Sequence, residues 1–84
     1  MNFIEACKIV VRECPDGYAK TYAKAGLNLD REYGQDQLEQ AQRVQALYIL
    51  TNMTKWRSPN ATRVRVFLKD FVEPKKIASG TWKL

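Results

Sequence analysis

The sequence predicts an all-α protein, a compact four-helix domain with a long third helix. Apolar residues recur every three or four positions through most of the chain, and Pro and Gly residues interrupt this pattern between the predicted helices. No segment of useful length alternates apolar and polar residues, as a half-buried strand does. We expect one helical domain over residues 1–74 and a basic C-terminal tail over 75–84. The hydrophobic core of an 84-residue chain gives only marginal stability on its own, so we also expect a homo-oligomer assembled through the third helix.

The first helix is predicted from Phe3 to Cys14. Asn2 and Glu5 are spaced as a capping box, and Pro15-Asp16-Gly17 ends the helix. Its apolar stripe consists of Phe3, Cys7, Val10 and Cys14. The two cysteines are separated by two helical turns, about 10 Å of rise, which is too far for a disulfide. We therefore expect both to be reduced residues of the core.

The second helix is predicted from Asp16 or Gly17 to Ala25, with Gly26 as a left-handed cap. A small repeat inside it, Tyr18-Ala19-Lys20 and Tyr22-Ala23-Lys24, stacks the two tyrosines on one face and the two lysines on another. The tyrosines form either a packing ridge or a platform for a ligand. Residues 27–35 are predicted to be a loop that Leu27 and Leu29 anchor to the core.

The third helix is predicted to start near Asp36 and to stop before Trp56-Arg57-Ser58-Pro59. Its first half is rich in glutamine, whereas Ala46 to Leu50 is apolar on all sides, which indicates the centre of the fold or a subunit interface. The fourth helix starts with Ser58 as N-cap and Pro59 in the first turn, and Glu73-Pro74 ends it. Its apolar stripe consists of Ala61, Val64, Leu68 and Phe71.

The net charge of +5 is spread unevenly along the chain. Residues 1–54 hold six basic and seven acidic residues, a net of −1, whereas residues 55–84 hold eight basic and two acidic residues, a net of +6. This asymmetry predicts an anionic partner for the C-terminal third. The alternative is a solvated basic face that only keeps the protein soluble.

The composition argues against most enzyme classes. The chain contains no histidine, so the common histidine-dependent nucleophiles and mixed cysteine–histidine zinc sites are excluded. The four glycines are scattered, so there is no glycine-rich phosphate loop. We expect no catalytic residues, no metal and no cofactor. The chain has no apolar run long enough to span a membrane and no recognisable signal peptide, which predicts a cytoplasmic protein without membrane contact.

The first candidate site lies around the start of the fourth helix. Arg57 precedes the helix N-terminus, where free N–H groups and the helix dipole favour an anion. The candidate residues are Arg57, Ser58, Asn60, Thr62, Arg63, Arg65 and Lys69. The alternative at this position is plain helix capping by the Ser-Pro pair.

The second candidate site combines aromatic and basic residues. Bases stack on aromatic rings while lysines contact phosphates, so this combination is typical of nucleotide and single-strand binding. The residues are Tyr18, Lys20, Tyr22 and Lys24, with Trp56 or Trp82. The alternative is that Tyr18, Tyr22 and Trp56 pack between helices.

Two segments carry a resemblance to short accessory proteins of tailed phages and prophages. Residues 44–57 read VQALYILTNMTKWR, and residues 61–65 read ATRVR. In those phage proteins a long helix ends in a similar Leu-x-Asn-Leu-x-x-Trp-Arg, and a second helix begins with Ala-x-x-Val. The similarity extends over about residues 18–72, with Met53 in place of leucine. It implies a phage-encoded, non-enzymatic role in blocking host defences.

Three functions are compatible with these patterns. The favoured one is sequestration of an anionic ligand, such as a nucleotide second messenger, in pockets between subunits. The first alternative is nucleic-acid binding through the basic C-terminal third, including a helix-turn-helix variant of it. The second alternative is inhibition of a host protein through the glutamine-rich face of the third helix.

Overall fold

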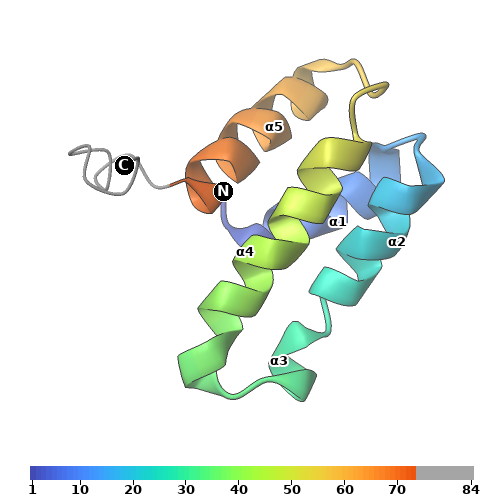
Figure 1. The fold of residues 1–84 in the computed structure, drawn as a ribbon. Coiled ribbons are helices and arrows are strands. Elements are labelled where there is room, and N and C mark those ends of the chain that lie inside the picture. Colours follow the sequence, from blue (N-terminus) through green and yellow to red (C-terminus); the bar gives the residue numbers. More distant parts are fainter. Residues whose placement is uncertain (74–84) are drawn as a thin grey trace.

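The computed structural model describes residues 1–73 and contains five helices and no strand within this range (Figure 1). The predicted basic tail and Trp82 lie outside the described residues. The helices are α1 (Phe3–Glu13), α2 (Gly17–Gly26), α3 (Leu29–Glu32), α4 (Gln35–Asn52) and α5 (Pro59–Val72). The all-α prediction is therefore confirmed for this part of the chain, with one short helix more than expected.

The capping box predicted for α1 is present. The side chain of Asn2 accepts the Glu5 amide at 2.8 Å, and the Glu5 carboxylate accepts the Asn2 amide at 3.1 Å. The predicted stripe is buried, and Ala6 joins it. α1 ends with Cys14 as its C-terminal cap, one residue before Pro15. Both ends of this helix follow from local sequence signals.

α2 differs from the prediction at its C-terminal end. Gly26 is the last helical residue, and Leu27 caps the helix in a right-handed conformation, so Gly26 is not a left-handed cap. The reason for glycine here is packing. A Cβ atom on Gly26 would lie 3.0 Å from Cys7 Sγ and 3.0 Å from Cζ of Phe3. The absence of a side chain lets α1 and α2 approach closely at this point.

The segment predicted as a loop over residues 27–35 contains α3. Its single turn is closed by the Tyr33 amide, which donates to the Leu29 carbonyl at 3.0 Å. Leu29 is buried against the core, as predicted, and Leu27 is half-buried. One helical turn is too short to produce a periodic apolar pattern, so sequence reasoning missed it.

α4 contacts α2, α3 and α5 (Figure 1). The apolar segment from Ala46 to Leu50 was predicted to lie at the centre of the fold or in a subunit interface, and within this chain only one side of it is covered. Ala46 and Ile49 are fully buried, whereas Leu47 and Tyr48 are 44% and 45% exposed. Gln45 donates to the Tyr22 carbonyl at 2.8 Å and ties α4 to α2.

After α4, the chain turns back through residues 53–58 into α5. Met53 and Trp56 are both buried in this turn, and the Trp56 amide donates to the Met53 carbonyl at 3.1 Å. Ser58 accepts the Ala61 amide, and Pro59 opens the helix, as predicted. This turn therefore both closes the core and sets the start of α5.

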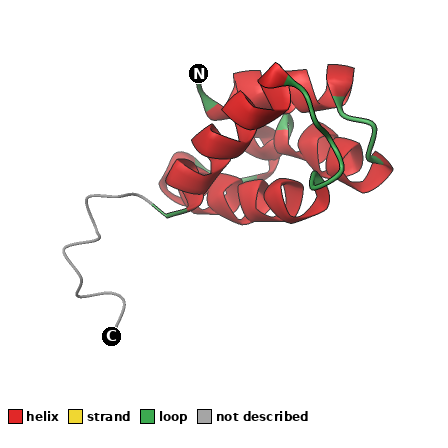
Figure 2. Ribbon diagram, turned by 90° about the horizontal axis from the view of Figure 1, so that it is seen from above, coloured by secondary structure: helices red, strands yellow, loops and turns green. Residues whose placement is uncertain are grey.

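The core is one cluster at the centre of the four longer helices, which pack around it (Figure 2). α1 packs against α2 and α5, and α4 covers α2 and α5. Stacked aromatic rings join α1 to α5, with the Phe3 and Phe71 centroids 5.5 Å apart. The largest fully buried side chains are Ile49, Met53, Leu68, Val10, Val64, Cys7 and Cys14.

The two buried cysteines are free, as predicted, and we expect them to be unreactive in the native protein. Burial raises the pKa of the Cys7 thiol to about 12, and burial is also the main reason why the pKa of Cys14 is raised. Only the thiolate is nucleophilic. A colorimetric thiol reagent should therefore titrate no cysteine in the native protein at mildly alkaline pH and both cysteines in denaturant.

The same pKa shift predicts the sign of an alkaline effect. Because the pKa of the Cys7 thiol is higher in the folded protein than in the unfolded chain, the unfolded chain loses this proton first as the pH rises. The stability present below the pKa of the unfolded thiol is therefore lost between that pKa and a pH of about 12. Urea unfolding midpoints should fall over that range in the wild type and fall less in Cys7→Ala. Rapid labelling of the native thiols would contradict this account.

Candidate anion-binding surface

The N-terminal part of α5 is positioned by hydrogen bonds that use several of the predicted site residues. Arg65 Nη2 donates to the carbonyl oxygens of Met53 at 3.3 Å and Trp56 at 3.1 Å. Arg65 therefore holds the turn that precedes α5, and its guanidinium has a structural role at this place. Ser58 is the N-cap, as the capping alternative predicted.

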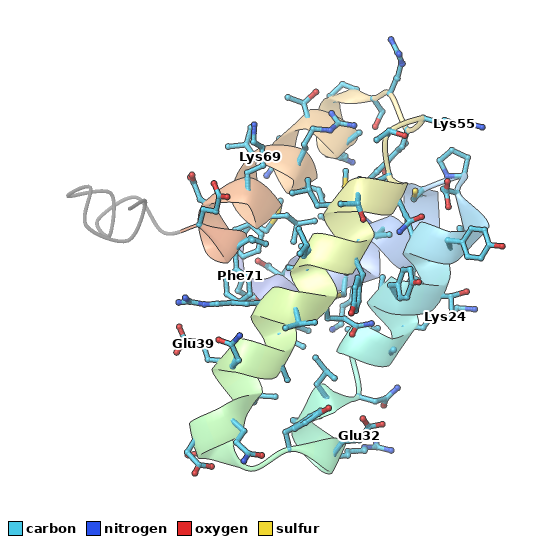
Figure 3. All side chains as sticks on the ribbon, in the orientation of Figure 1. Lys24, Glu32, Glu39, Lys55, Lys69 and Phe71 are labelled. Atoms are coloured by element: carbon cyan, nitrogen blue, oxygen red, sulfur yellow. The ribbon has the colours of Figure 1, made fainter. Side chains whose placement is uncertain are left out.

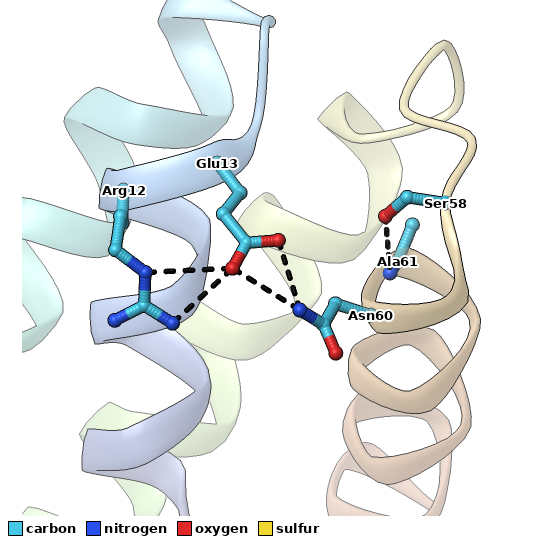
Figure 4. A network of polar contacts seen from close by, with 5 residues as sticks. All are labelled: Arg12, Glu13, Ser58, Asn60 and Ala61. Carbon is cyan, nitrogen blue, oxygen red and sulfur yellow. Dashed lines mark hydrogen bonds and ion pairs between the residues drawn. The ribbon is translucent and has the colours of Figure 1, made fainter.

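Asn60 joins α5 to the end of α1 (Figure 4). Its amide nitrogen donates to both carboxylate oxygens of Glu13, at 3.0 and 3.1 Å, and Arg12 pairs with the same carboxylate at 3.2 Å. The hydrogen bond from Asn60 is the largest cause of the lowered pKa of Glu13, and Arg12 lowers it further. The amide nitrogen of Asn60 thus binds a protein carboxylate, and Asn60 lines neither of the hollows described below, so its contact with a phosphate stays a prediction.

Arg63 lies apart from Arg57 and Arg65 and faces α1. A hollow of about 380 Å³, here called the α1–α5 hollow, is lined by Met1, Glu5, Lys8, Ile9, Arg12 and Arg63. Three of its lining side chains are basic, and they come from two helices that are far apart in the sequence. Among the described residues, Lys8 and Arg63 form no ion pair, so their charges are available to a ligand.

A second hollow, here called the Arg57 hollow, lies at the start of α5. It has a volume of about 500 Å³ and is lined by Thr54, Trp56, Arg57, Ser58, Pro59, Thr62 and Arg65. Four of the seven residues predicted around the start of this helix, Arg57, Ser58, Thr62 and Arg65, line this hollow, whereas Asn60, Arg63 and Lys69 do not. Arg63 follows Thr62 directly in the helix, so the two hollows lie on either side of the same turn of α5. Lys69 is exposed further along α5 (Figure 3) and lines neither hollow.

The tyrosine–lysine site on α2 is only partly assembled. The Tyr22 ring lies 5.2 Å from the Tyr48 ring and is half-buried, so this tyrosine packs between helices. Tyr18 is 73% exposed and lines a hollow of about 560 Å³ with Thr21 and Lys55. Lys20 is half-buried, and Lys24 is exposed outside this hollow.

Trp56 does not present a ring face to a ligand. It is only 4% exposed and belongs to the core, so the prediction that it stacks on a base is wrong and the packing alternative is correct. Trp56 is buried because it lies in the turn after α4, which Arg65 holds in place by donating to the Trp56 carbonyl. Within residues 1–73, Tyr18 is therefore the predicted base-stacking residue that faces outward.

Sequence reasoning missed Lys8 and Arg12. These residues lie four apart on the polar side of α1, and this spacing was the available signal. Their meeting with Arg63 depends on the packing of α1 against α5, which no local pattern contains. The structure thus replaces one predicted basic cluster by two, one on each side of α5.

Comparisons with known proteins add no assignment, because no family, no curated protein and no solved structure matches this chain. Within residues 1–73, no group of three potential metal-ligating side chains is present. None of the helices described is long and apolar enough to span a membrane.

Proposed function

We propose that this chain is a non-catalytic protein that binds and sequesters an anionic, phosphate-bearing ligand, with a nucleotide second messenger as the favoured class. The observation that carries the proposal is the α1–α5 hollow, where Lys8, Arg12 and Arg63 meet. Arg guanidinium groups bind phosphate oxygens with paired, charge-assisted hydrogen bonds, and Lys contributes a point charge. Arg12 is paired with Glu13, and the Glu5 carboxylate also lines the hollow. Lys8 and Arg63 are therefore the two cations whose charge an anion would balance.

The Arg57 hollow supplies a second contact for the same ligand. Its Arg57 guanidinium and its Thr54 and Thr62 hydroxyls are donors suited to phosphate and ribose oxygens. Hollows of about 380 and 500 Å³ fall in the range of small-molecule sites, about 300–1,000 Å³. A ligand with two phosphates could therefore contact both sides of α5.

The biological role in this proposal is phage counter-defence in the host cytoplasm. It rests on the resemblance of residues 44–57 and 61–65 to phage accessory proteins, because sequestering a signal nucleotide is one way to block a host defence. Tyr18, which is exposed, is the residue that we propose to stack on a base, with Lys55 of the same hollow near it.

Nucleic acid is the second candidate ligand, and one observation favours it. The basic side chains lie on both sides of an exposed helix instead of converging in one closed cavity. An extended phosphate backbone can contact such a surface along its length. This candidate predicts an affinity that falls steeply with salt, since each neutralised phosphate releases a counterion.

Calorimetric titration of the full chain tests the proposal. The ligands are cyclic mononucleotides, cyclic dinucleotides and a short single-stranded oligonucleotide, each at low and at high salt. We expect Arg63→Glu to weaken binding by at least about tenfold, because it removes one charge and introduces the opposite one. Arg31→Glu is the matched control, since Arg31 is exposed on α3 and lines neither hollow.

The outcomes separate the candidates. Saturable binding of one nucleotide, lost in Arg63→Glu and kept in Arg31→Glu, supports sequestration. Binding of the oligonucleotide alone, with a steep salt dependence, supports the nucleic-acid candidate. If no ligand binds at low salt, or if both variants weaken binding equally, the proposed surface is wrong.

A further inference from the structure

The outward face of α4 carries apolar side chains that the rest of the domain leaves exposed. Val44, Leu47 and Tyr48 are 40%, 44% and 45% exposed, and their spacing of three and four residues places them in one strip. Figure 1 shows α4 crossing in front of α1, with α5 on one side and α2 and α3 on the other. When exposed apolar side chains form one contiguous patch, that patch is a candidate interaction surface.

The strip continues into a hollow between α3 and α4. This hollow has a volume of about 650 Å³, and Val44 and Tyr48 line it together with Tyr33, Gln37, Gln40 and, at the start of α4, the acidic Asp36. The glutamine amides are neutral groups that both donate and accept hydrogen bonds. Residues 44–52 contain no charged side chain, although 27% of the whole chain is charged.

Opposite charges lie at the two ends of this neutral strip. Residues 28–43 hold four acidic residues, Asp30, Glu32, Asp36 and Glu39, against two arginines, a net of −2. Residues 53–58, which follow α4 directly, hold Lys55 and Arg57 and no acidic residue, a net of +2. Figure 3 shows Glu32 and Glu39 toward one end of the molecule, with Lys55 and Lys69 toward the other. The 18 residues of α4 separate the two ends by about 27 Å.

We propose that a second copy of this chain covers this face, with the two α4 helices antiparallel about a two-fold axis near residue 46. In this orientation Val44 of one protomer lies opposite Tyr48 of its partner. The acidic end around Asp36 then lies beside the partner's basic end around Lys55 and Arg57, and the symmetry repeats this contact. A parallel pair would place equal charges side by side.

The charge pattern selects a second copy over other occupants. Two copies of a chain with a net charge of +5 repel each other in most relative orientations. In the antiparallel orientation, however, the acidic end of each α4 strip lies against the basic end of the other, and the neutral strips lie between them. Self-complementarity is the requirement of a two-fold interface. This inference does not depend on anion binding in the α1–α5 hollow, but it competes with binding at Lys55 and Arg57, because these side chains lie beside the partner's acidic end in the dimer.

Sedimentation velocity of the full chain, over a dilution series that reaches high concentration, tests the interface. We expect a dimer for the wild type, and an increase of the dissociation constant by about 100-fold in Val44→Glu, because the symmetry makes the change twice. Val66→Glu is the matched control, since Val66 is 56% exposed on α5, away from the strip. Far-UV circular dichroism verifies that both variants are folded.

A charge exchange tests the orientation. Asp36→Lys and Lys55→Asp should each weaken the dimer, and the double variant should recover most of the loss, because it restores opposite charges across the axis. A wild-type monomer at every concentration, or equal dissociation in Val44→Glu and Val66→Glu, overturns the proposed interface. A double variant as weak as the single ones overturns the antiparallel arrangement.

Discussion

Replacement of Trp56 by alanine is expected to lower the free energy of unfolding by about 3–5 kcal/mol, a large part of the stability of a small domain. The Trp56 side chain is 4% exposed, so its truncation leaves a cavity at the turn between α4 and α5, while the backbone carbonyl that accepts from Arg65 stays in place. Urea unfolding followed by far-UV circular dichroism measures the change.

Tyr18→Ala is the control for Trp56→Ala, because it also truncates an aromatic residue of the predicted binding site. Tyr18 is 73% exposed, so its truncation should change stability by no more than about 0.5 kcal/mol. Equal effects of the two substitutions would show that Trp56 is not a core residue. Trp56 would then again be a candidate for stacking on a base of the ligand.

Replacement of Gly26 by valine should lower the free energy of unfolding by about 1–3 kcal/mol or more, because it overpacks the contact between α1 and α2. A Cβ atom there already lies 3.0 Å from Cys7 Sγ and Phe3 Cζ, and valine adds two methyl groups. The same urea titration measures the effect. Gly17→Val is the matched control, since no atom lies within 4 Å of a Cβ atom at Gly17.

A double-mutant cycle identifies the cause of the Gly26 effect. Cys7→Ala removes the sulfur atom that the new side chain meets, so Gly26→Val should cost less in the Cys7→Ala background than in the wild type. Gly26→Val could instead lower the free energy of unfolding equally in both backgrounds, or Gly17→Val could lower it as much as Gly26→Val does. Either result would mean that the low helix propensity of valine, and not the close contact, causes the effect.

Local signals in the sequence predicted most of the fold. The pair Asn2 and Glu5 and the pair Ser58-Pro59 define helix starts within a few residues, and both starts were predicted correctly. The helix end at Gly26 was wrong, because the glycine serves a contact with α1 that lies outside its local segment. α3 was missed, because one turn gives no periodicity.

The candidate site was less predictable, because it depends on packing between α1 and α5. Arg57 and Arg65 were grouped correctly, and both line the same hollow. Arg63 was placed with them, although residues two apart point to different sides of a helix. Asn60 reaches Glu13, 47 positions away in the sequence, and no local pattern contains this contact.

The central claim, that a phosphate-bearing ligand binds around α5, is tested most directly by amide chemical shifts. The ¹⁵N-labelled full chain is titrated with the nucleotides and the oligonucleotide used for calorimetry. The account predicts saturable shifts grouped at Lys8, Arg12, Arg57, Thr62 and Arg63, and their loss in Arg63→Glu. Shifts confined to Lys20 and Lys24 on α2, or no shifts with any of these ligands, would contradict it.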